Sequence, residues 1–350
     1  FPYRLHKEGK MRYTTRAKGE CIMRRRTFLA GAGLAALQLA GCGTAPQTVP
    51  DYVLTYADNQ PSDYPTTQGA QYFADLVRER TGGKVVIQVK ADGEYGTEQE
   101  VWQQLAIGGV DFARLSLSVL TDDLPKLNVL MLPYIYRDAG HMWRVLDGDI
   151  GEEFLQAFAE GGCVGLSWYD AGARSFYSRQ PIRSLADLAG KTVRVQDSPV
   201  ILEMIRLLGA VPETTAYSDV YAAFQTGQID AAENNWPAYY SMDHYKVARY
   251  YTLDEHSRVP EIQLASGSTW TKLPTEYRET LRECARESAQ YERGLWAQEE
   301  TAARQKALDA GCREITLSDE ELERFRTLVQ PLYAQFCAAY LPLVEEIQQE

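Results

Sequence analysis

The stretch EVWQQLAIGGVDFA, residues 100–113, aligns without gaps with DVYAAFQTGQIDAA, residues 219–232. Both begin with an acidic residue, a valine and an aromatic residue, and both reach Gly-x-(Val/Ile)-Asp at the same offsets. This pattern is typical of a helix that ends at a glycine and is followed directly by a strand. One explanation of the match is that helix-to-strand turns in α/β proteins generally look alike. The other is that the chain forms two similar lobes, each holding one copy.

Strand and helix patterns alternate along the rest of the chain. A valine-rich alternation predicts a strand over 85–89, and Thr97-x-x-Glu100 is a capping box that starts a helix ending at Gly108-Gly109. Further strands are predicted over 52–57, 110–115, 164–167, 192–197, 228–232 and 313–317. Further helices are predicted over 68–80, over 275–310 as one or two long helices, after Ser318, and over 341–350. The alternation predicts an α/β fold with mixed, mostly parallel sheets.

The composition indicates a globular chain with an acidic body. Its 350 residues are 45% hydrophobic, and the chain is long enough for two domains. Residues 1–41 hold nine Lys and Arg and two Glu, whereas residues 42–350 hold 27 basic and 46 acidic residues, a formal charge of −19. Such a body argues against a nucleic-acid partner, because phosphate contacts need a basic face.

Residues 1–41 are predicted to be a leader for export, with extra residues upstream of Met23. A run of three arginines precedes an apolar segment over 28–40, which is too short for a stable transmembrane helix. The motif LAGC, which ends at Cys42, resembles a lipobox and predicts lipidation of that cysteine. An ordinary secretory signal with an incidental cysteine is the alternative. Residues 42–50 are predicted to be a polar linker.

The body lacks the motifs of common enzymes and metal sites. It has no P-loop and no Gly-x-Ser-x-Gly elbow, and its histidines lack the spacing of metal ligands. We therefore predict no enzyme activity, no cofactor and no metal. The four body cysteines lack a CxxC pair, and the sequence leaves one or two disulfides open among Cys163, Cys284, Cys312 and Cys337.

Polar residues on or after predicted strands favour a binding function. Arg194 lies in the predicted strand TVRVQD, where its guanidinium must be paired by a structural salt bridge or by a ligand carboxylate. Arg174 is either a second cation of such a clamp or a surface arginine. Asn234 follows another predicted strand, where α/β sheets bind ligands, although Asn-Asn-Trp-Pro also suits a simple turn. Aromatic residues that either contact a ligand or fill the core are Tyr217, Trp168 and Trp236.

Two segments, 165–198 and 216–261, resemble the extracytoplasmic solute receptors of tripartite ATP-independent periplasmic (TRAP) transporters. The shared markers are Gly172-x-Arg174, Arg194, Tyr217-Ser218-Asp219-Val220-Tyr221, Gln225-Thr226-Gly227, Asp230 and Glu233-Asn234. The resemblance implies a two-lobed periplasmic-binding-protein clamp, with long C-terminal helices that brace both lobes. Lobe 1 is expected to hold residues 51–171 and about 260–299, and lobe 2 residues 172–259 and about 300–350.

The resemblance also implies the ligand-binding residues. Arg194 takes the position of the arginine that forms the ligand salt bridge, and Arg174 that of a supporting arginine. The implied positions also include Asn234, Tyr217, Glu94 and Asn59, with His256 in a supporting position behind them. Trp168 and Trp236 complete the expected set of ligand-binding residues, because their rings would stack on the carbons of a sugar acid. Arg114 stands where sialic-acid receptors place an acidic contact, which argues against sialic acid.

The resemblance predicts a receptor that captures a small carboxylate-bearing molecule and delivers it to the permease subunits of a TRAP transporter. The segments SWYDAGARSFY and ENNWP resemble receptors for hexuronates such as glucuronate or galacturonate. A C4-dicarboxylate, a keto acid or an aromatic acid is the alternative ligand, and a sensor subunit or a periplasmic enzyme is the alternative role. The protein is expected outside the cytoplasmic membrane, with the lipid on Cys42 as its membrane contact.

Overall fold

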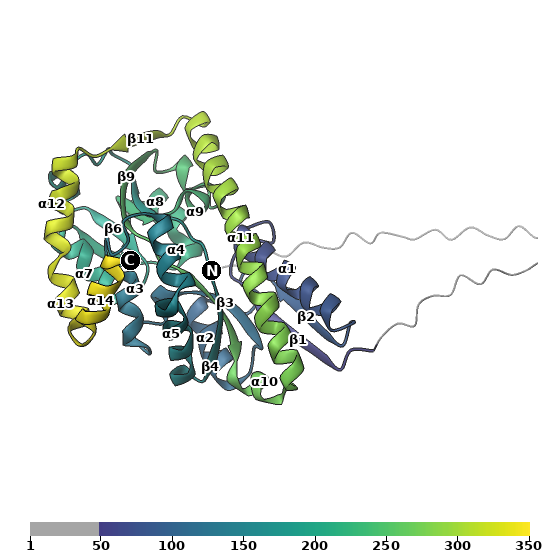
Figure 1. Cartoon of the computed structure of the whole chain (residues 1–350). Helices are drawn as coiled ribbons and strands as arrows, with labels where there is room; N and C mark the ends of the chain where they lie inside the picture. Colours follow the sequence, from purple (N-terminus) through teal and green to yellow (C-terminus); the bar gives the residue numbers. More distant parts are fainter. Residues whose placement is uncertain (1–48) are drawn as a thin grey trace, which may run out of the picture. The chain divides into compact units, whose positions relative to one another are not determined.

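The computed structural model describes residues 49–350 (Figure 1). The predicted leader, the predicted lipidation site Cys42 and most of the predicted linker lie outside the described residues. Among the helices of the described part, none combines the length and the apolar character that crossing a membrane requires.

Five strands form the first sheet, called sheet 1, in the order β2-β1-β3-β10-β4. They are β1 (Tyr52–Ala57), β2 (Val85–Lys90), β3 (Phe112–Ser116), β4 (Cys163–Tyr169) and β10 (Glu261–Ser266). β1 is parallel to both of its neighbours, whereas β10 is antiparallel to β3 and β4. The structure confirms the predicted strands at the positions of β1, β2, β3 and β4.

Six strands form the second sheet, sheet 2, in the order β11-β9-β5-β8-β6-β7. They are β5 (Arg174–Ser178), β6 (Thr192–Val195), β7 (Val211–Thr214), β8 (Ala231–Asn234), β9 (Tyr250–Ser257) and β11 (Arg313–Thr316). β5 is antiparallel to β8 and β9, and the other pairs are parallel. β6, β8 and β11 fall on predicted strands, although β8 begins three residues later than predicted.

The chain passes between the two sheets through short connections. β4 of sheet 1 leads through residues 170–173 into β5 of sheet 2, and β9 leads back through residues 258–260 into β10 of sheet 1. The two entering strands, β5 and β10, are each antiparallel to both neighbours. We propose that these connections divide the predicted lobes, with lobe 1 around sheet 1 and lobe 2 around sheet 2.

Helices pack against both sheets. Lobe 1 carries α1 (Pro65–Arg80), α2 (Glu98–Ile107), α3 (Asn128–Met131), α4 (Ala139–Asp147), α5 (Asp149–Ala157) and α10 (Gly267–Lys272). Lobe 2 carries α6 (Leu185–Leu188), α7 (Pro199–Leu207), α8 (Val220–Thr226) and α9 (Trp236–Ser241). α1 begins three residues before its predicted start, because Pro65 is favourable in the first helical turn, where no backbone N–H is needed.

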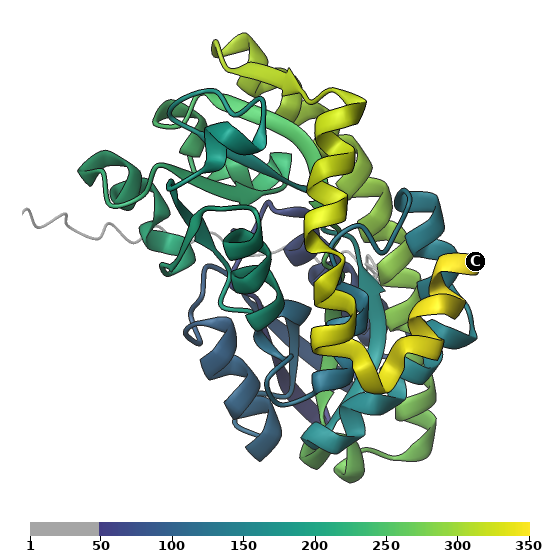
Figure 2. The same ribbon diagram turned by 90° about the vertical axis from the view of Figure 1, so that its left-hand side faces the viewer.

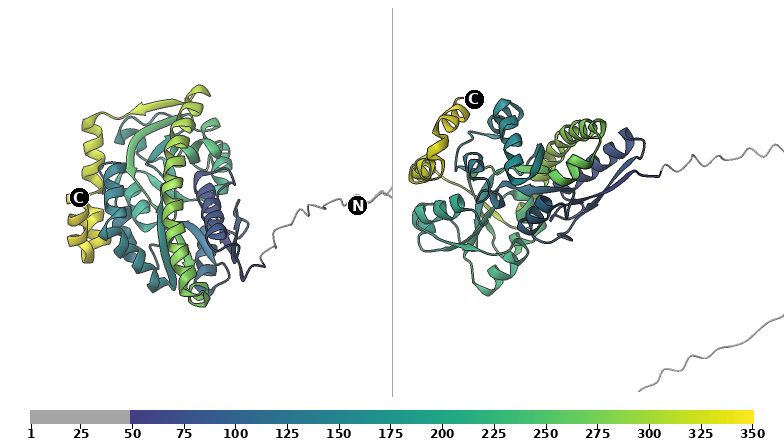
Figure 3. Two further views of the ribbon diagram at one scale, coloured as in Figure 1. Left: turned by 45° about the vertical axis from the view of Figure 1, so that its right-hand side comes forward. Right: turned by 90° about the horizontal axis from the view of Figure 1, so that it is seen from below.

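The predicted long helix is one continuous element, α11 (Thr275–Asp309), and its 35 residues make it about 52 Å long. In lobe 1 the Ser288 hydroxyl on α11 bonds the Tyr169 hydroxyl on β4 over 3.0 Å. In lobe 2 the buried Ala303 and Ala307 belong to the same hydrophobic cluster as Tyr239 of α9. α11 therefore contacts both lobes, and it runs past both sheets in Figures 1 and 3.

The C-terminal helices make a second connection between the lobes (Figure 2). They are α12 (Asp319–Val329), α13 (Pro331–Cys337) and α14 (Leu341–Gln349). Phe325 of α12 packs edge to face against Phe176 on β5 of lobe 2. Tyr333 of α13 donates its hydroxyl to the carbonyl of Pro133 in lobe 1 over 2.8 Å. The predicted helix after Ser318 is confirmed, and the Ser318 hydroxyl caps it by accepting from the N–H of Glu321.

The four cysteines of the described part are buried and unpaired: Cys163, Cys284, Cys312 and Cys337. The disulfides that the sequence left open are therefore not formed. Burial raises the pKa of the Cys163 and Cys337 thiols to about 12. Protonated thiols in the core pack as small apolar groups.

The two aligned stretches form the same local structure in different lobes. α2 and α8 end at Gly108 and Gly227, which have positive φ values of 77° and 75°. The N–H of each glycine bonds carbonyls of the last helical turn, and a strand, β3 or β8, follows. The predicted helix–glycine–strand unit is confirmed at both places.

Alanine at Gly227 is expected to lower the free energy of unfolding by about 1–2 kcal/mol, because a side chain disfavours the left-handed conformation. Alanine at Gly108 is expected to cost more. A Cβ there would lie 2.1 Å from the Ser268 hydroxyl, whereas the nearest atom at Gly227 is the Arg179 Nη1 at 3.6 Å. Urea denaturation of both variants measures the difference, and equal losses would contradict this account of the packing.

Candidate functional site

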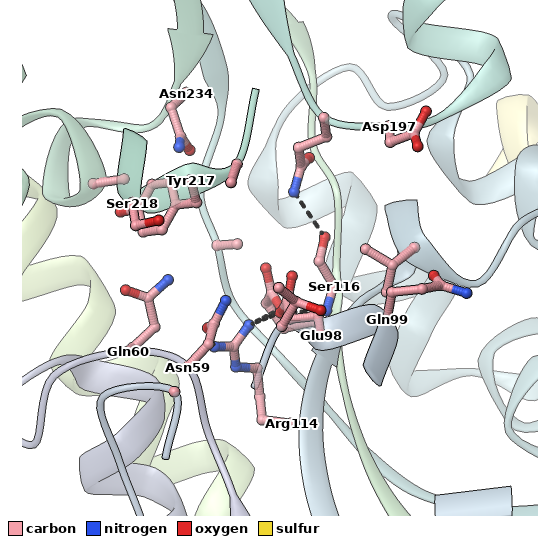
Figure 4. Close-up of a pocket in the computed structure, with 18 of the residues that line it drawn as sticks. Asn59, Gln60, Glu98, Gln99, Arg114, Ser116, Asp197, Tyr217, Ser218 and Asn234 are labelled. Carbon is pink, nitrogen blue, oxygen red and sulfur yellow. Dashed lines mark hydrogen bonds and ion pairs between the residues drawn. The ribbon is translucent and has the colours of Figure 1, made fainter. Parts of the chain in front are cut away.

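The carboxyl ends of strands from both sheets face a cavity of about 630 Å³. Asn59 follows β1 and Arg114 lies on β3, so lobe 1 supplies one wall. Lobe 2 supplies the facing wall, with Tyr217 after β7 and Asn234 at the end of β8 (Figure 4). Ligands of α/β proteins bind at this end of the strands, so the cavity is the candidate ligand site.

Arg194 on β6 is a buried cation at the edge of this cavity. Its side chain is 5% exposed, and its Nε donates to the backbone carbonyl of Thr215 over 2.9 Å. Within residues 49–350, no carboxylate lies at ion-pair distance from its guanidinium. Burial lowers the pKa of Arg194, although the group stays charged at neutral pH. The guanidinium of Arg194 therefore faces the cavity with N–H groups that remain available to bond a ligand.

Arg174 on β5 differs from Arg194, because the chain itself pairs it. Its Nε and Nη2 donate to the two carboxylate oxygens of Glu233 over 2.5 Å and 2.9 Å, a bidentate arrangement. Its Nη1 donates to the Asn234 side-chain oxygen over 3.0 Å. Arg174 thus holds Asn234 at the cavity wall, is itself held by the buried Glu233, and has few donors left for a ligand.

His256 lies behind this pair. Its Nδ1 bonds Asp254 over 2.8 Å, and its Nε2 lies 3.4 Å from a carboxylate oxygen of Glu233. Burial alone would lower the pKa of His256, but Asp254 and Glu233 outweigh burial and raise it to about 9. Burial would raise the pKa of Glu233, but Arg174 and His256 lower it to about 2. His256 supports Glu233 and does not line the cavity.

Arg114, on the wall of lobe 1, is surrounded by acidic side chains. Its Nη1 donates to Glu98 over 2.6 Å and to Glu261 over 2.8 Å, and its Nη2 donates to Asp58 and to the Asn59 side-chain oxygen. Burial would lower the pKa of Arg114, but the three carboxylates raise it well above its ordinary value. Unlike Arg194, Arg114 is fully compensated by its own chain.

Several polar atoms of the cavity wall are buried and have no hydrogen-bond partner in the described chain. They are Gln60 Oε1, Arg114 Nε, Gln196 Oε1, Thr215 Oγ1, the Tyr217 hydroxyl and Trp296 Nε1. Buried polar groups in native proteins are nearly always bonded, so these atoms are unsatisfied donors and acceptors that lie just behind the cavity surface. The Gln196 amide also donates to the Ser116 hydroxyl over 3.3 Å and so joins the two walls (Figure 4).

Five predicted ligand residues come together at this cavity: Arg194, Arg174, Asn234, Tyr217 and Asn59. Three others do not line it. Trp168 on β4 is 2% exposed and packs against Phe158, because alternate side chains of a strand face opposite sides. Trp236 stacks on Tyr251 in the core of lobe 2, with ring centroids 3.6 Å apart. Glu94 points to solvent and pairs with Lys90.

The sequence analysis did not identify the acidic residues that surround Arg114 on the lobe 1 wall of the cavity. Glu98, four residues after Glu94, is the first residue of α2 and lines the cavity, and Glu261 begins β10. The sequence did contain a signal for these acidic residues. Arg114 lies within a predicted strand, as Arg194 does, and a buried arginine needs carboxylate partners. The described residues contain no cluster of three or more His, Cys, Asp or Glu that suits a metal ion.

Replacing His256 with glutamine is expected to destabilise the protein in a pH-dependent way. The pKa of His256 is raised from 6.5 to about 9, so its charged form contributes full stability below pH 6.5 and loses that contribution as the pH rises through 9. The difference in melting temperature between the wild type and His256→Gln should therefore be largest near pH 6 and shrink toward pH 9.5. A difference that does not vary with pH would contradict a charged His256.

Comparisons with known proteins show the family to which the chain belongs. The family model for bacterial extracellular solute-binding protein, family 7, matches residues 56–339. A solute-binding protein of Chromohalobacter salexigens is 37% identical over 277 residues, which cover 79% of this chain and 82% of the relative.

Two solved structures are similar along most of their length. A TRAP periplasmic solute binding protein from Bradyrhizobium, in complex with α/β-D-galacturonate, is 38% identical with a TM-score of 0.82, covering 85% of this chain and 99% of its own. A second, from Pseudomonas putida with bound D-glucuronate, is 33% identical with a TM-score of 0.82, covering 84% and 96%. The chain is a solute-binding receptor and belongs to family 7 of the bacterial extracellular solute-binding proteins.

Proposed function

We propose that this receptor captures a hexuronate, such as D-galacturonate or D-glucuronate, and delivers it to the membrane subunits of a TRAP transporter. The observation that carries the proposal is Arg194, a buried guanidinium at the cavity without a carboxylate partner in the described chain. A carboxylate matches the planar fork of a guanidinium and accepts two hydrogen bonds from it. The acid group of the ligand therefore binds Arg194.

The rest of the cavity suits a polyhydroxylated molecule. The residues that line it include the amides of Asn59 and Gln60 and the carboxylate of Glu98. Sugar hydroxyls both donate and accept, so they can bond groups of either kind. The bound galacturonate and glucuronate of the two similar structures support the same ligand class.

Binding without turnover is the proposed action. Lobes that face each other across the cavity contact the ligand from both sides, so the ligand stabilises the closed arrangement. A TRAP permease receives the ligand when the lobes open. Unchanged ligand recovered from the denatured complex is the expected result for a receptor, and a converted sugar acid would instead indicate an enzyme.

Replacing Arg194 with methionine is expected to weaken hexuronate binding about 30-fold or more, because loss of one partner of a buried charge pair costs about 2–5 kcal/mol. Isothermal titration with D-galacturonate, D-glucuronate and succinate measures both the affinity and the ligand preference. A matched control is Arg206→Met, which removes an exposed arginine of α7 that pairs with Glu203.

The melting temperature of ligand-free Arg194→Met distinguishes two roles for Arg194: binding the ligand carboxylate, or forming an ion pair that stabilises the fold. Arg194→Met removes a buried charge that no carboxylate of the described chain compensates, so the melting temperature should stay the same or rise. Normal hexuronate binding by this variant would overturn the carboxylate site. Strong destabilisation of the ligand-free protein would instead assign Arg194 a structural role.

We infer an extracytoplasmic location with a lipid anchor on Cys42, from the family and from the lipobox-like LAGC motif. Replacing Cys42 with alanine in the full chain is expected to move the protein from the membrane fraction to the soluble fraction of a bacterial host. Immunoblots of the two fractions measure the shift. The same distribution for wild type and variant would contradict the anchor.

A further inference from the structure

We infer that the wall around Arg114 restricts the receptor to sugar acids with a single carboxylate and rejects those that carry a second carboxylate at the opposite end. This inference rests on the proposed binding of the ligand carboxylate at Arg194. The wall accepts hydrogen bonds from the hydroxyls of a hexuronate. It repels the second carboxylate of an aldaric acid, the diacid form of the same sugar.

The wall holds more negative than positive charge. Asp58, Glu98 and Glu261 all bond the single guanidinium of Arg114, and Glu98 also accepts the N–H of Ser116 over 3.1 Å. The side chains of Glu98 and Glu261 are 13% and 12% exposed, and both line the cavity. Because one cation meets three carboxylates, a ligand at this wall encounters net negative charge.

Two carboxylate oxygens of the wall have no hydrogen-bond partner among residues 49–350. Arg114 bonds Oε1 of Glu98 and Oε2 of Glu261, which leaves Oε2 of Glu98 and Oε1 of Glu261. An ionised carboxylate oxygen only accepts hydrogen bonds, so a ligand hydroxyl fits it and a ligand carboxylate does not. Like charges placed together in a buried site strongly disfavour a wrong partner.

Arg114 cannot form a bidentate salt bridge with a second carboxylate of the ligand. Four of its five N–H groups lie on Nη1 and Nη2, and both nitrogens already donate to the chain's own acceptors. Its Nε is buried without a partner in the described chain, but a single donor does not form the bidentate pair that a carboxylate prefers. Of the cavity's arginines within residues 49–350, Arg194 is thus the one without a carboxylate partner.

Protonation of Glu261 supports the same inference. Burial and Glu98 raise the pKa of Glu261 to about 7, although Arg114 opposes the shift. Charged or titratable groups that influence Glu261 come from four elements and the loop between β1 and α1: Arg114, Glu98, Asp58, Tyr64, Arg174 and Glu292. Protonation below pH 7 removes one negative charge from the wall, so the rejection of a diacid should weaken as the pH falls.

The test compares galactarate with galactonate, two open-chain acids of the same sugar that differ by one carboxylate. Titration calorimetry, or competition against bound D-galacturonate, gives the ratio of their dissociation constants at pH 6.0 and pH 8.0. Wild-type protein is expected to bind galactarate at least about tenfold more weakly than galactonate at pH 8.0, with a smaller ratio at pH 6.0.

Glu98→Gln is expected to lower this ratio about tenfold at pH 8.0, because it removes a charge of the wall and keeps the shape of the side chain. Glu261→Gln is the second variant, and it should also abolish the pH dependence of the ratio. Glu160→Gln removes an exposed lobe 1 carboxylate that does not line the cavity, so it controls for overall charge. Melting temperatures confirm that each variant is folded.

An unchanged ratio in both cavity variants would overturn the inference, as would wild-type protein that binds the diacid as tightly as the monoacid. Failure of every variant to bind galactarate would also count against it, since the variants are expected to admit the diacid. These outcomes differ from failure of the proposed function, in which the wild type binds neither D-galacturonate nor D-glucuronate.

Discussion

A guanidinium that is removed from water needs a counter-charge, and this requirement organises the ligand site. Among the described residues that line the cavity there are three arginines, Arg114, Arg174 and Arg194. The described part of the chain supplies carboxylates to the first two and none to the third. Burial of Arg194 therefore costs free energy in the empty receptor, and the proposed carboxylate ligand would offset that cost. The proposed preference for a carboxylate follows from this difference.

Closure of the receptor follows from where the polar groups lie. Lobe 1 presents acceptors around Arg114, and lobe 2 presents Arg194 and its neighbours, so a ligand with one acid group and several hydroxyls satisfies both walls at once. Ala171 and Trp296 line the cavity where the chain passes between the sheets and where α11 crosses. A ligand held by both walls thus lies next to the elements that connect the lobes.

Much of the fold was predictable because its determinants are local. The capping box at Thr97, the glycines that end α2 and α8, and the proline-free run of α11 each act within a few residues. The order of the strands was not predictable in this way. β10 lies between β3 and β4 because the chain returns from sheet 2, and no local pattern encodes a pairing between residues about 150 positions apart.

The sequence by itself determined the alternation of elements, the acidic body and a strand with an arginine at its centre. These properties depend on residue type and spacing. Only the tertiary structure decided which arginine has no carboxylate partner among residues 49–350, because Asp58, Glu98 and Glu261 reach Arg114 from three separate segments. It also decided that Trp168 and Trp236 fill the core while Glu98 faces the ligand cavity, since burial depends on which elements pack together.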